Sequence, residues 1–148
     1  MPRQPPHASS LRKGRVSEPG RVYLVTTVTH QRTPFFAEFH HARTLVTALR
    51  GEALHQRAET LAWVIMPDHL HWLLTLHPGA RLSQVVGSVK SVTAHAIGQR
   101  LWQAGFHDHA LRNEEDLPAI ARYMVANPVR KGLVCRVGDW PHWDAIWL

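Results

Sequence analysis

The sequence predicts an α+β fold of the ferredoxin-like or split βαβ type, an antiparallel sheet with helices packed on it. Two observations lead to this prediction. Strand-like runs of β-branched and apolar residues alternate with stretches whose apolar residues recur every three or four positions, in the order β-α-β-β-α-β-α. The length of 148 residues, with 45% hydrophobic side chains, suits one domain with a sizeable core. We therefore expect one domain without internal repeats.

Three predicted strands and one helix occupy the first half of the chain. Residues 21–29 are dense in β-branched side chains, which favour a strand. A loop at 31–36 leads to an amphipathic helix at about 38–55. Apolar runs at 61–66 and 69–76 flank a Pro-Asp pair, a combination typical of tight turns. These two runs are therefore predicted to form a β-hairpin.

The second half of the chain is predicted to hold helix, strand and helix. Helical spacing of apolar residues runs over 82–101, and a short strand is expected at 107–112. Asn113 is the predicted N-cap of the last helix, with carboxylates in its first turn. This helix is expected to end near Asn127, because Pro128 follows and disfavours helical backbone before it.

We divide the chain into three parts. Residues 1–19 are basic and rich in proline, so we expect a flexible arm. Residues 20–134 form the predicted domain. Residues 135–148 form a tail with three tryptophans, expected to pack on the domain as a short extended segment.

The charge balance favours a polyanionic partner. Seventeen Lys and Arg against eleven Asp and Glu give a net charge of +6, which suits nucleic acid, although a merely basic protein is the alternative. The single cysteine, Cys135, excludes an intrachain disulfide and a cysteine-based zinc site. No apolar run approaches the ~18 residues of a membrane span, and the N-terminus lacks the pattern of a secretory signal. We expect a cytoplasmic protein without a membrane partner, associated with the nucleoid when it binds DNA.

Two histidines on the second strand of the hairpin are candidate metal ligands. His69 and His71 are two residues apart, so a strand projects both imidazoles from one face, where they suit a divalent metal. With 12 histidines in the chain such a pair also arises by chance, and His107 and His109 form another. The alternative is a pair of half-buried histidines satisfied by their neighbours.

The last helix offers a possible second half of that site. Tyr123 and Asn127 are four residues apart and therefore share a helix face. A phenol beside two imidazoles and an amide oxygen suits metal-assisted phosphoryl transfer, in which the phenolate attacks a phosphate and forms a phosphotyrosine. The alternatives are an amphipathic edge position for Tyr123 and a helix C-cap for Asn127.

Five segments also carry a family resemblance, and the Tyr-x-x-x-Asn-Pro-Val stretch is the most specific of them. The chain resembles the REP-associated tyrosine transposases of bacteria, a branch of the single-tyrosine HUH transposases in which U is any hydrophobic residue. Relatives in the broader group tend to carry Gln at the position of Asn127. The segments follow the order of that family: 20–26, 66–71, 90–93, 102–109 and 123–134.

The resemblance implies an HUH-endonuclease fold and assigns the site. It implies Tyr123 as the nucleophile, His69 and His71 as ligands of Mg²⁺ or Mn²⁺, and Asn127 as the third ligand. The family cuts single-stranded DNA beside hairpins such as REP-like repeats, forms a 5′-phosphotyrosine and frees a 3′-OH. Rejoining then needs no ATP, because the phosphodiester energy is kept.

Contacts to DNA are expected from basic and imidazole side chains around this site. His107 and His109 become residues that support the metal ligands or touch DNA. For each basic residue, a solvated surface charge is the alternative. The candidates for phosphate contacts are Arg12, Lys13, Arg15, Arg21, Lys90, Arg112, Arg130 and Lys131.

The function expected from the sequence is therefore a metal-dependent single-stranded DNA endonuclease and strand transferase acting beside hairpins. The alternative is a catalytically silent protein of the same fold that binds hairpin or single-stranded DNA. A metal-dependent hydrolase fits less well, because it needs a carboxylate near the metal and Asp68 would point to the other face unless the turn redirects it. We expect a monomer rather than a homodimer.

Overall fold

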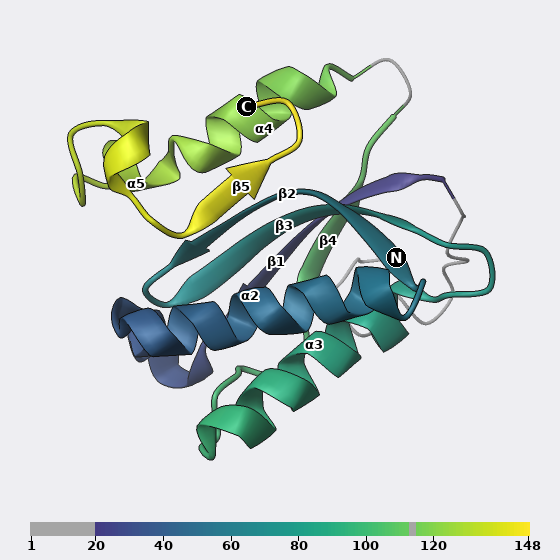
Figure 1. Ribbon diagram of the computed structural model, residues 1–148, viewed down its shortest axis with the longest axis horizontal. Helices are drawn as coiled ribbons and strands as arrows, with labels where there is room; N and C mark the ends of the chain where they lie inside the picture. The colour runs from purple at the N-terminus through teal and green to yellow at the C-terminus, as the bar shows by residue number, and fades with distance from the viewer. Residues whose placement is uncertain (1–19, 113–114) are drawn as a thin grey trace, which may run out of the picture.

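A five-stranded antiparallel sheet organises the computed structural model, which describes residues 20–112 and 115–148. The strand order is β4-β1-β3-β2-β5 (Figure 1). The central strand β3 therefore lies between β1 and β2 and has a neighbour on each side. In chain order the strands are β1 Val22–Val28, β2 Ala58–Met66, β3 His69–Leu76, β4 His107–Ala110 and β5 Trp143–Ala145.

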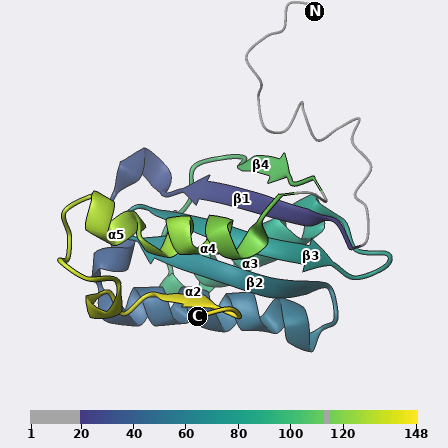
Figure 2. The same ribbon diagram turned by 90° about the horizontal axis from the view of Figure 1, so that it is seen from above.

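Helices cover both faces of the sheet. The helices α2 Phe39–Leu54 and α3 Leu82–Ile97 pack on one face, and α4 Leu117–Val125 with α5 Asn127–Arg130 lies on the other (Figures 1 and 2). This layering confirms the predicted α+β class with an antiparallel sheet. In the described residues, no helix has the length and apolar character needed to cross a membrane.

The alternation of side chains along β3 separates two cores. Leu70, Trp72 and Leu74 are fully buried in the larger core, beneath α2 and α3. Leu73 belongs to a smaller core on the opposite face, together with residues of α4. Because side chains two apart share a face, His69 and His71 lie on the α4 side with Leu73. The predicted separation of the histidines from the Leu70, Trp72 and Leu74 face is confirmed.

The turn between β2 and β3 is fixed by neighbouring backbone. The amide of Thr29 donates to the carbonyl of Asp68 at 3.0 Å, and the amide of Phe36 donates to the carbonyl of Pro67 at 2.9 Å. The Thr29 hydroxyl adds a second hydrogen bond to the Asp68 carbonyl at 3.1 Å. The end of β3 that carries His69 is therefore tied to the end of β1.

Two predicted helix boundaries were wrong. The predicted helix over 82–101 ends at Ile97, because Gly98 takes the left-handed conformation (φ 81°) and its amide closes the last turn on the carbonyl of Ala94. The last helix begins at Leu117, where the Asp116 side chain accepts a hydrogen bond from the amide of Ala119. Asp116 is thus its N-cap, and Asn113, the predicted cap, lies outside the described residues.

The last helix also ends differently from the prediction. Helix α4 stops at Val125, and Ala126 is its C-cap, so a C-cap role for Asn127 is excluded. The chain continues directly into the short helix α5, with Pro128 in its first turn. Proline is tolerated there, since the first amides of a helix need no partner within the helix.

The tail adds a strand that the predicted order lacked. Strand β5 pairs antiparallel with β2, in a register that places Trp143 opposite Val64 and Ala145 opposite Ala62. The Trp140 indole donates to the carbonyl of Ile65 at 3.0 Å. The three tail tryptophans pack against the smaller core. The tail thereby covers the edge of β2 beside α4.

Candidate functional site

His69 and His71 lie side by side on the sheet face that α4 covers. Their ring centroids are 4.8 Å apart and the ring planes are nearly perpendicular, at 83°. Neither ring is fully exposed, and the His69 side chain is only 13% accessible. The sheet thus holds two imidazoles close together on a rigid support.

Asp68 orients His69. Its Oδ1 accepts a hydrogen bond from His69 Nδ1 at 2.7 Å, and its Oδ2 accepts from Arg32 Nη1 at 3.1 Å. Burial opposes ionisation of Asp68, but the hydrogen bonds from His69 and Arg32 outweigh it and hold the pKa of the carboxyl below its usual value. A carboxylate at Nδ1 favours the tautomer that leaves Nε2 with its lone pair directed outward. The turn has therefore redirected Asp68 toward the histidine face.

His71 is held in a comparable way from the neighbouring strand. Its Nδ1 lies 2.9 Å from Thr26 Oγ1, and the two residues are opposite one another in the β1–β3 pairing. Burial lowers the pKa of His71 to about 4, assisted by electrostatic interactions with His69, Arg130 and Lys131. The imidazole is therefore neutral near pH 7, which is the form that binds metals.

The helix that carries Tyr123 packs on the same face as the two histidines. Ala121 and Met124 of α4 join Val64 and Leu73 of the sheet in the smaller core. Tyr123 itself points outward and is 67% exposed. Arg130, at the end of α5, and Lys131, directly after it, both act electrostatically on the pKa of His71, as expected if α5 ends near the imidazole pair.

Arg130 links Tyr123 to Asn127. Its Nη1 donates to the backbone carbonyl of Tyr123 at 2.7 Å, and its Nη2 donates to Asn127 Oδ1 at 2.9 Å. Its guanidinium carbon also lies 3.6 Å from the centroid of the Tyr123 ring, in cation–π contact. Asn127 is buried, at 8% exposed, so its amide orientation is set by this bond. One side chain therefore contacts both residues of the last helix that the sequence singled out.

The second histidine pair shares this face of the sheet. Thr26 is opposite His71 on one side and opposite His107 on the other, so the three form a row across β3, β1 and β4. His109 is opposite Leu24 and lies 3.9 Å from Glu115 through its Nε2 and the carboxylate. Both rings are exposed. Their predicted role near the metal ligands or DNA stays a prediction.

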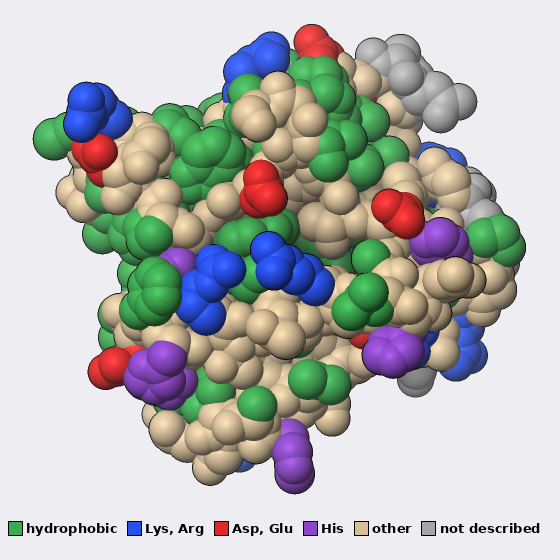
Figure 3. All heavy atoms as spheres, viewed as in Figure 1, with side chains coloured by type: hydrophobic (Ala, Val, Ile, Leu, Met, Phe, Trp, Pro, Cys, Tyr) green, Lys and Arg blue, Asp and Glu red, His purple; other side chains and the backbone are tan. Residues whose placement is uncertain are grey.

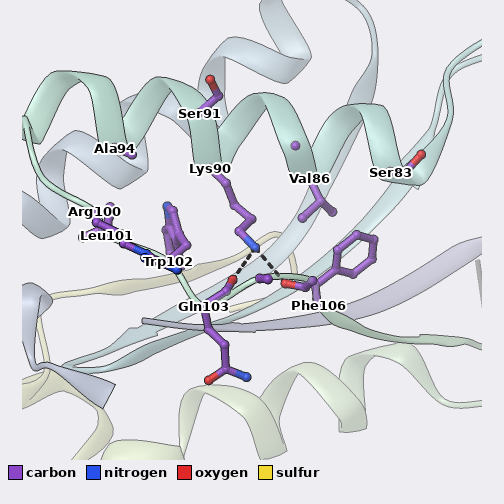
Figure 4. A pocket seen from close by; sticks show the side chains of 13 residues that line it. Ser83, Val86, Lys90, Ser91, Ala94, Arg100, Leu101, Trp102, Gln103 and Phe106 are labelled. Carbon is purple, nitrogen blue, oxygen red and sulfur yellow. Dashed lines mark hydrogen bonds between the residues drawn. The ribbon is translucent and has the colours of Figure 1, made fainter. Parts of the chain in front are cut away.

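Lys90 is used within the chain, on the other face of the sheet. Its Nζ donates to the carbonyls of Gln103 and Gly105 at 2.8 and 2.7 Å (Figure 4). The amine lies in a pocket of about 510 Å³ between α3 and residues 100–106. The Lys90 amine thus lies on the sheet face opposite α4, away from His69 and His71, and its predicted contact to phosphate stays a prediction.

The remaining basic candidates differ in how much of them is engaged. Arg21 Nε donates to the carbonyl of Leu111 at 3.0 Å. The side chains of Arg112, Arg130 and Lys131 are exposed, and that of Arg130 also makes the contacts to Tyr123 and Asn127 described above. On the face shown in Figure 3, Lys and Arg side chains are interspersed with Asp and Glu instead of forming one basic field. Net charge alone therefore does not outline a DNA footprint there. Arg12, Lys13 and Arg15 lie outside the described residues.

Comparison with known proteins identifies the family. The family model described as Transposase IS200 like matches residues 21–124, which include both histidines of β3 and Tyr123. The chain belongs to the IS200-like transposase family. The resemblance to REP-associated tyrosine transposases that the sequence predicted is confirmed by the relatives and the solved structure described next.

Two curated relatives carry the name REP-associated tyrosine transposase. The protein of Escherichia coli (strain K12) is 39% identical over 85 residues, 56% of this chain. The chain aligns with about half of that relative's length, 52%. A putative REP-associated tyrosine transposase of Haemophilus influenzae (strain ATCC 51907 / DSM 11121 / KW20 / Rd) is 27% identical over 139 residues, which cover 83% of this chain and 78% of the relative.

Solved structures agree with the fold. The structure of a REP-associated tyrosine transposase bound to a REP hairpin superposes with a TM-score of 0.77 at 29% identity, covering 87% of this chain and 79% of that one. A putative transposase from Deinococcus radiodurans R1 gives a TM-score of 0.54 at 21% identity, covering 78% of this chain and 94% of that one. The second likeness concerns the fold alone.

In this IS200-like transposase, two side chains, His69 and His71, fit the role of ligands to one divalent metal ion. Each imidazole has Nδ1 held by a neighbour, which leaves Nε2 of both rings to coordinate. Within the described residues, no group of three or more His, Cys, Asp or Glu side chains could hold a metal ion. Among the described residues, a third ligand would therefore be of another type, such as the amide oxygen of Asn127, which already accepts one hydrogen bond from Arg130.

Three contacts around the site were missed or incompletely predicted from the sequence. Thr26 was predicted only as a strand residue. The pairing register of β1 with β3, which places Thr26 beside His71, is set by the assembled sheet and cannot be obtained from one strand. Asp68 was considered as a turn residue and as a metal carboxylate, although a carboxylate directly before a histidine in a turn is a detectable signal for an orienting partner. Arg130 was named as a phosphate contact without its stacking on Tyr123, since the contact spans seven residues and the break at Ala126.

Proposed function

We propose that this chain is a metal-dependent single-stranded DNA endonuclease and strand transferase that cuts beside hairpins through a covalent 5′-phosphotyrosine. One observation carries the proposal most directly: the helix that bears Tyr123 packs on the sheet face that presents His69 and His71. The solved relative that is bound to a REP hairpin supports a DNA hairpin, such as a REP-like repeat, as the partner.

In this proposal Tyr123 is the nucleophile. Its exposed phenol is open to a DNA strand lying across α4. The phenolic oxygen attacks the phosphorus of the scissile linkage, and the bond between that phosphorus and the 3′ oxygen breaks. The fragment on the 3′ side of the cut is then bound to the tyrosine through its 5′ phosphate. The fragment on the 5′ side of the cut is released with a 3′-OH. The phenol gives up its proton to solvent, and the leaving 3′ oxygen takes one up. Attack by a 3′-OH on the phosphotyrosine reverses these steps and joins strands.

His69 and His71 would hold Mg²⁺ or Mn²⁺ through Nε2, with Asn127 as the candidate third ligand through the lone pair that Arg130 does not use. The chemistry that such a cation would supply there is polarisation of the scissile phosphate and stabilisation of the charge that develops during attack. Asp68 and Thr26 keep both rings oriented for this role. We further propose a monomer that acts in the cytoplasm, at the nucleoid when bound to DNA.

The direct test uses a hairpin oligonucleotide with a single-stranded flank, incubated with Mn²⁺ or Mg²⁺, that carries a 3′ label to report the fragment bound to the protein and a different 5′ label to report the released fragment. Wild-type protein is expected to form a covalent adduct that survives denaturing electrophoresis, together with a product ending in 3′-OH. Tyr123→Phe is expected to bind the hairpin but to form neither. The matched control is Tyr23→Phe, because Tyr23 is buried on the other face of the sheet.

Two other outcomes would replace the proposal. Hairpin binding without any adduct, at every metal tested, would identify a binding protein that keeps the fold without the chemistry. Cleavage that persists in Tyr123→Phe, with no protein-linked product at any time, would identify water as the attacking group and favour a metal-dependent hydrolase.

A further inference from the structure

We propose that Arg130 binds the scissile phosphate and holds the Tyr123 ring for attack, acting as a clamp between nucleophile and substrate. The inference rests on the proposed function and adds a residue to it. It starts from the position of the guanidinium, which lies 3.6 Å from the centroid of the phenol ring. Since the reacting oxygen is bonded to that ring, a cation stacked on the ring also lies close to the phosphate that the oxygen attacks.

The guanidinium is fixed in that position from two sides. Nη1 is anchored on the Tyr123 carbonyl and Nη2 on Asn127 Oδ1. Tyr123 belongs to α4, Asn127 and Arg130 belong to α5, and the contacts of the Arg130 side chain hold the three together. Because Asn127 is buried, its amide is a firm anchor. Arg130 is thus preorganised beside the nucleophile and needs little rearrangement when DNA arrives.

The charge of Arg130 is still available to an anion. Both of its anchors are neutral oxygens, and no carboxylate of residues 20–112 or 115–148 forms an ion pair with it. The guanidinium also carries N–H donors beyond the two that are engaged. A planar guanidinium matches two phosphate oxygens at once, a geometry that a lysine ammonium cannot reproduce. A phosphate is therefore the complement that this group lacks.

Arg122 offers a matched control. It is also an arginine, it is exposed, and it lies in the last turn of α4 beside Tyr123 in the sequence. Its side chain makes no hydrogen bond or ion pair within the described part of the chain. Replacing it removes the same unit of charge near the nucleophile without removing a contact to the Tyr123 ring or to Asn127. Any effect specific to Arg130 must therefore come from its contacts.

The experiment measures adduct formation at saturating hairpin DNA in single turnover, together with the Kd for the hairpin. Arg130→Ala is expected to lower the rate at saturation by about 100-fold or more, as loss of a preorganised charge donor does. Arg130→Lys is expected to stay at least about 10-fold below wild type, because the ammonium cannot stack and fork at once. Both variants, and Arg122→Ala, are expected to bind the hairpin within roughly 5-fold of wild type, and Arg122→Ala is expected to keep its rate within about 2-fold.

A substrate change gives a readout that a merely structural role would not move. Methylphosphonate at the scissile linkage, each isomer used separately, replaces a charged oxygen with a methyl group. If Arg130 contacts that oxygen, one isomer slows the wild type far more than it slows Arg130→Ala, since the partner is already missing. Equal slowing of both proteins by each isomer would overturn the contact.

Other results of the rate measurement would separate the role of Arg130 from the proposed function. A rate loss below about 5-fold in Arg130→Ala, or a full rate in Arg130→Lys, overturns the clamp while leaving the proposed function intact. Absence of any Tyr123-dependent adduct in wild type overturns both. Should Arg130→Ala melt more than about 5 °C below wild type, Arg130→Lys carries the rate and methylphosphonate comparisons in its place.

Discussion

Acidification is expected to destabilise the fold through His71. Burial lowers the pKa of this imidazole from 6.5 to about 4 in the folded chain. Between these two values the unfolded chain binds a proton that the folded chain refuses, so the free energy of unfolding falls as the pH decreases. At about 1.4 kcal/mol per pH unit, the full difference amounts to roughly 3 kcal/mol. That is a large part of the ~5–15 kcal/mol that holds a domain of this size together.

The measurement is urea unfolding followed by circular dichroism, at intervals from pH 7.5 to pH 4. His71→Gln removes the titrating ring, and the difference between its free energy of unfolding and that of wild type isolates His71 from groups that titrate in both proteins. This difference is expected to change by about 3 kcal/mol, with wild type losing stability relative to the variant as the pH falls. His95→Gln, at an exposed position on α3, controls for the loss of an imidazole.

His142 acts in the same direction, since burial and the positive charge of Arg43 lower its pKa. It therefore contributes to the pH dependence of wild type and of His71→Gln alike and cancels in their difference. A difference that stays constant from pH 7.5 to pH 4 would refute the argument. It would mean that α5 and the sheet do not keep His71 away from water.

Three further predictions follow from the site and its support. Asp68→Asn is expected to weaken Mn²⁺ binding by about 10- to 100-fold, measured by calorimetry, because His69 loses the carboxylate that orients it; unchanged affinity would remove Asp68 from the site. Mn²⁺ is expected to support adduct formation at lower concentration than Mg²⁺, because imidazole ligands suit Mn²⁺ better than the oxygen-seeking Mg²⁺, and a titration of each metal tests the order. Met124→Ala is expected to lower the free energy of unfolding by about 2–4 kcal/mol and to loosen α4, because Met124 is buried in the smaller core. Val92→Ala, at a 52% exposed position, is expected to lower it by less than about 1 kcal/mol in the same urea melts.

The pairing of residues on each element was accessible from local periodicity. A strand alternates its side chains, so His69 and His71 had to share a face whatever the rest of the chain did. A helix repeats every three to four residues, so Tyr123 and Asn127 were predicted to share a helix face. The structure instead places Tyr123 in α4 and Asn127 in α5, and Arg130 contacts both. Boundaries were less accessible, because competing signals lie close together. Gly98 ended α3 inside an apolar pattern that continued to Leu101, and Asp116 capped α4 three residues after the predicted cap.

The tail shows why some elements escape local patterns. Strand β5 has three residues, too few for an alternation to be recognised, and it exists because β2 offers an edge for pairing. The three tryptophans of the tail pack against the smaller core, as predicted. The strand itself depends on a partner about 80 residues earlier in the sequence. Pairings over such separations are set by the assembled sheet.

The sequence by itself therefore determined the chemical groups of the candidate site, the pairing of His69 and His71 on one strand face, and the family to which the chain belongs. Only the tertiary structure decided that the helix lies on the histidine face, that Thr26 and Asp68 hold the two rings, and that Arg130 stacks on Tyr123. The physical reason is the range of the forces involved. Periodicity follows from the geometry of one backbone segment, whereas registers, tautomers and stacked cations arise where segments distant in sequence are packed together.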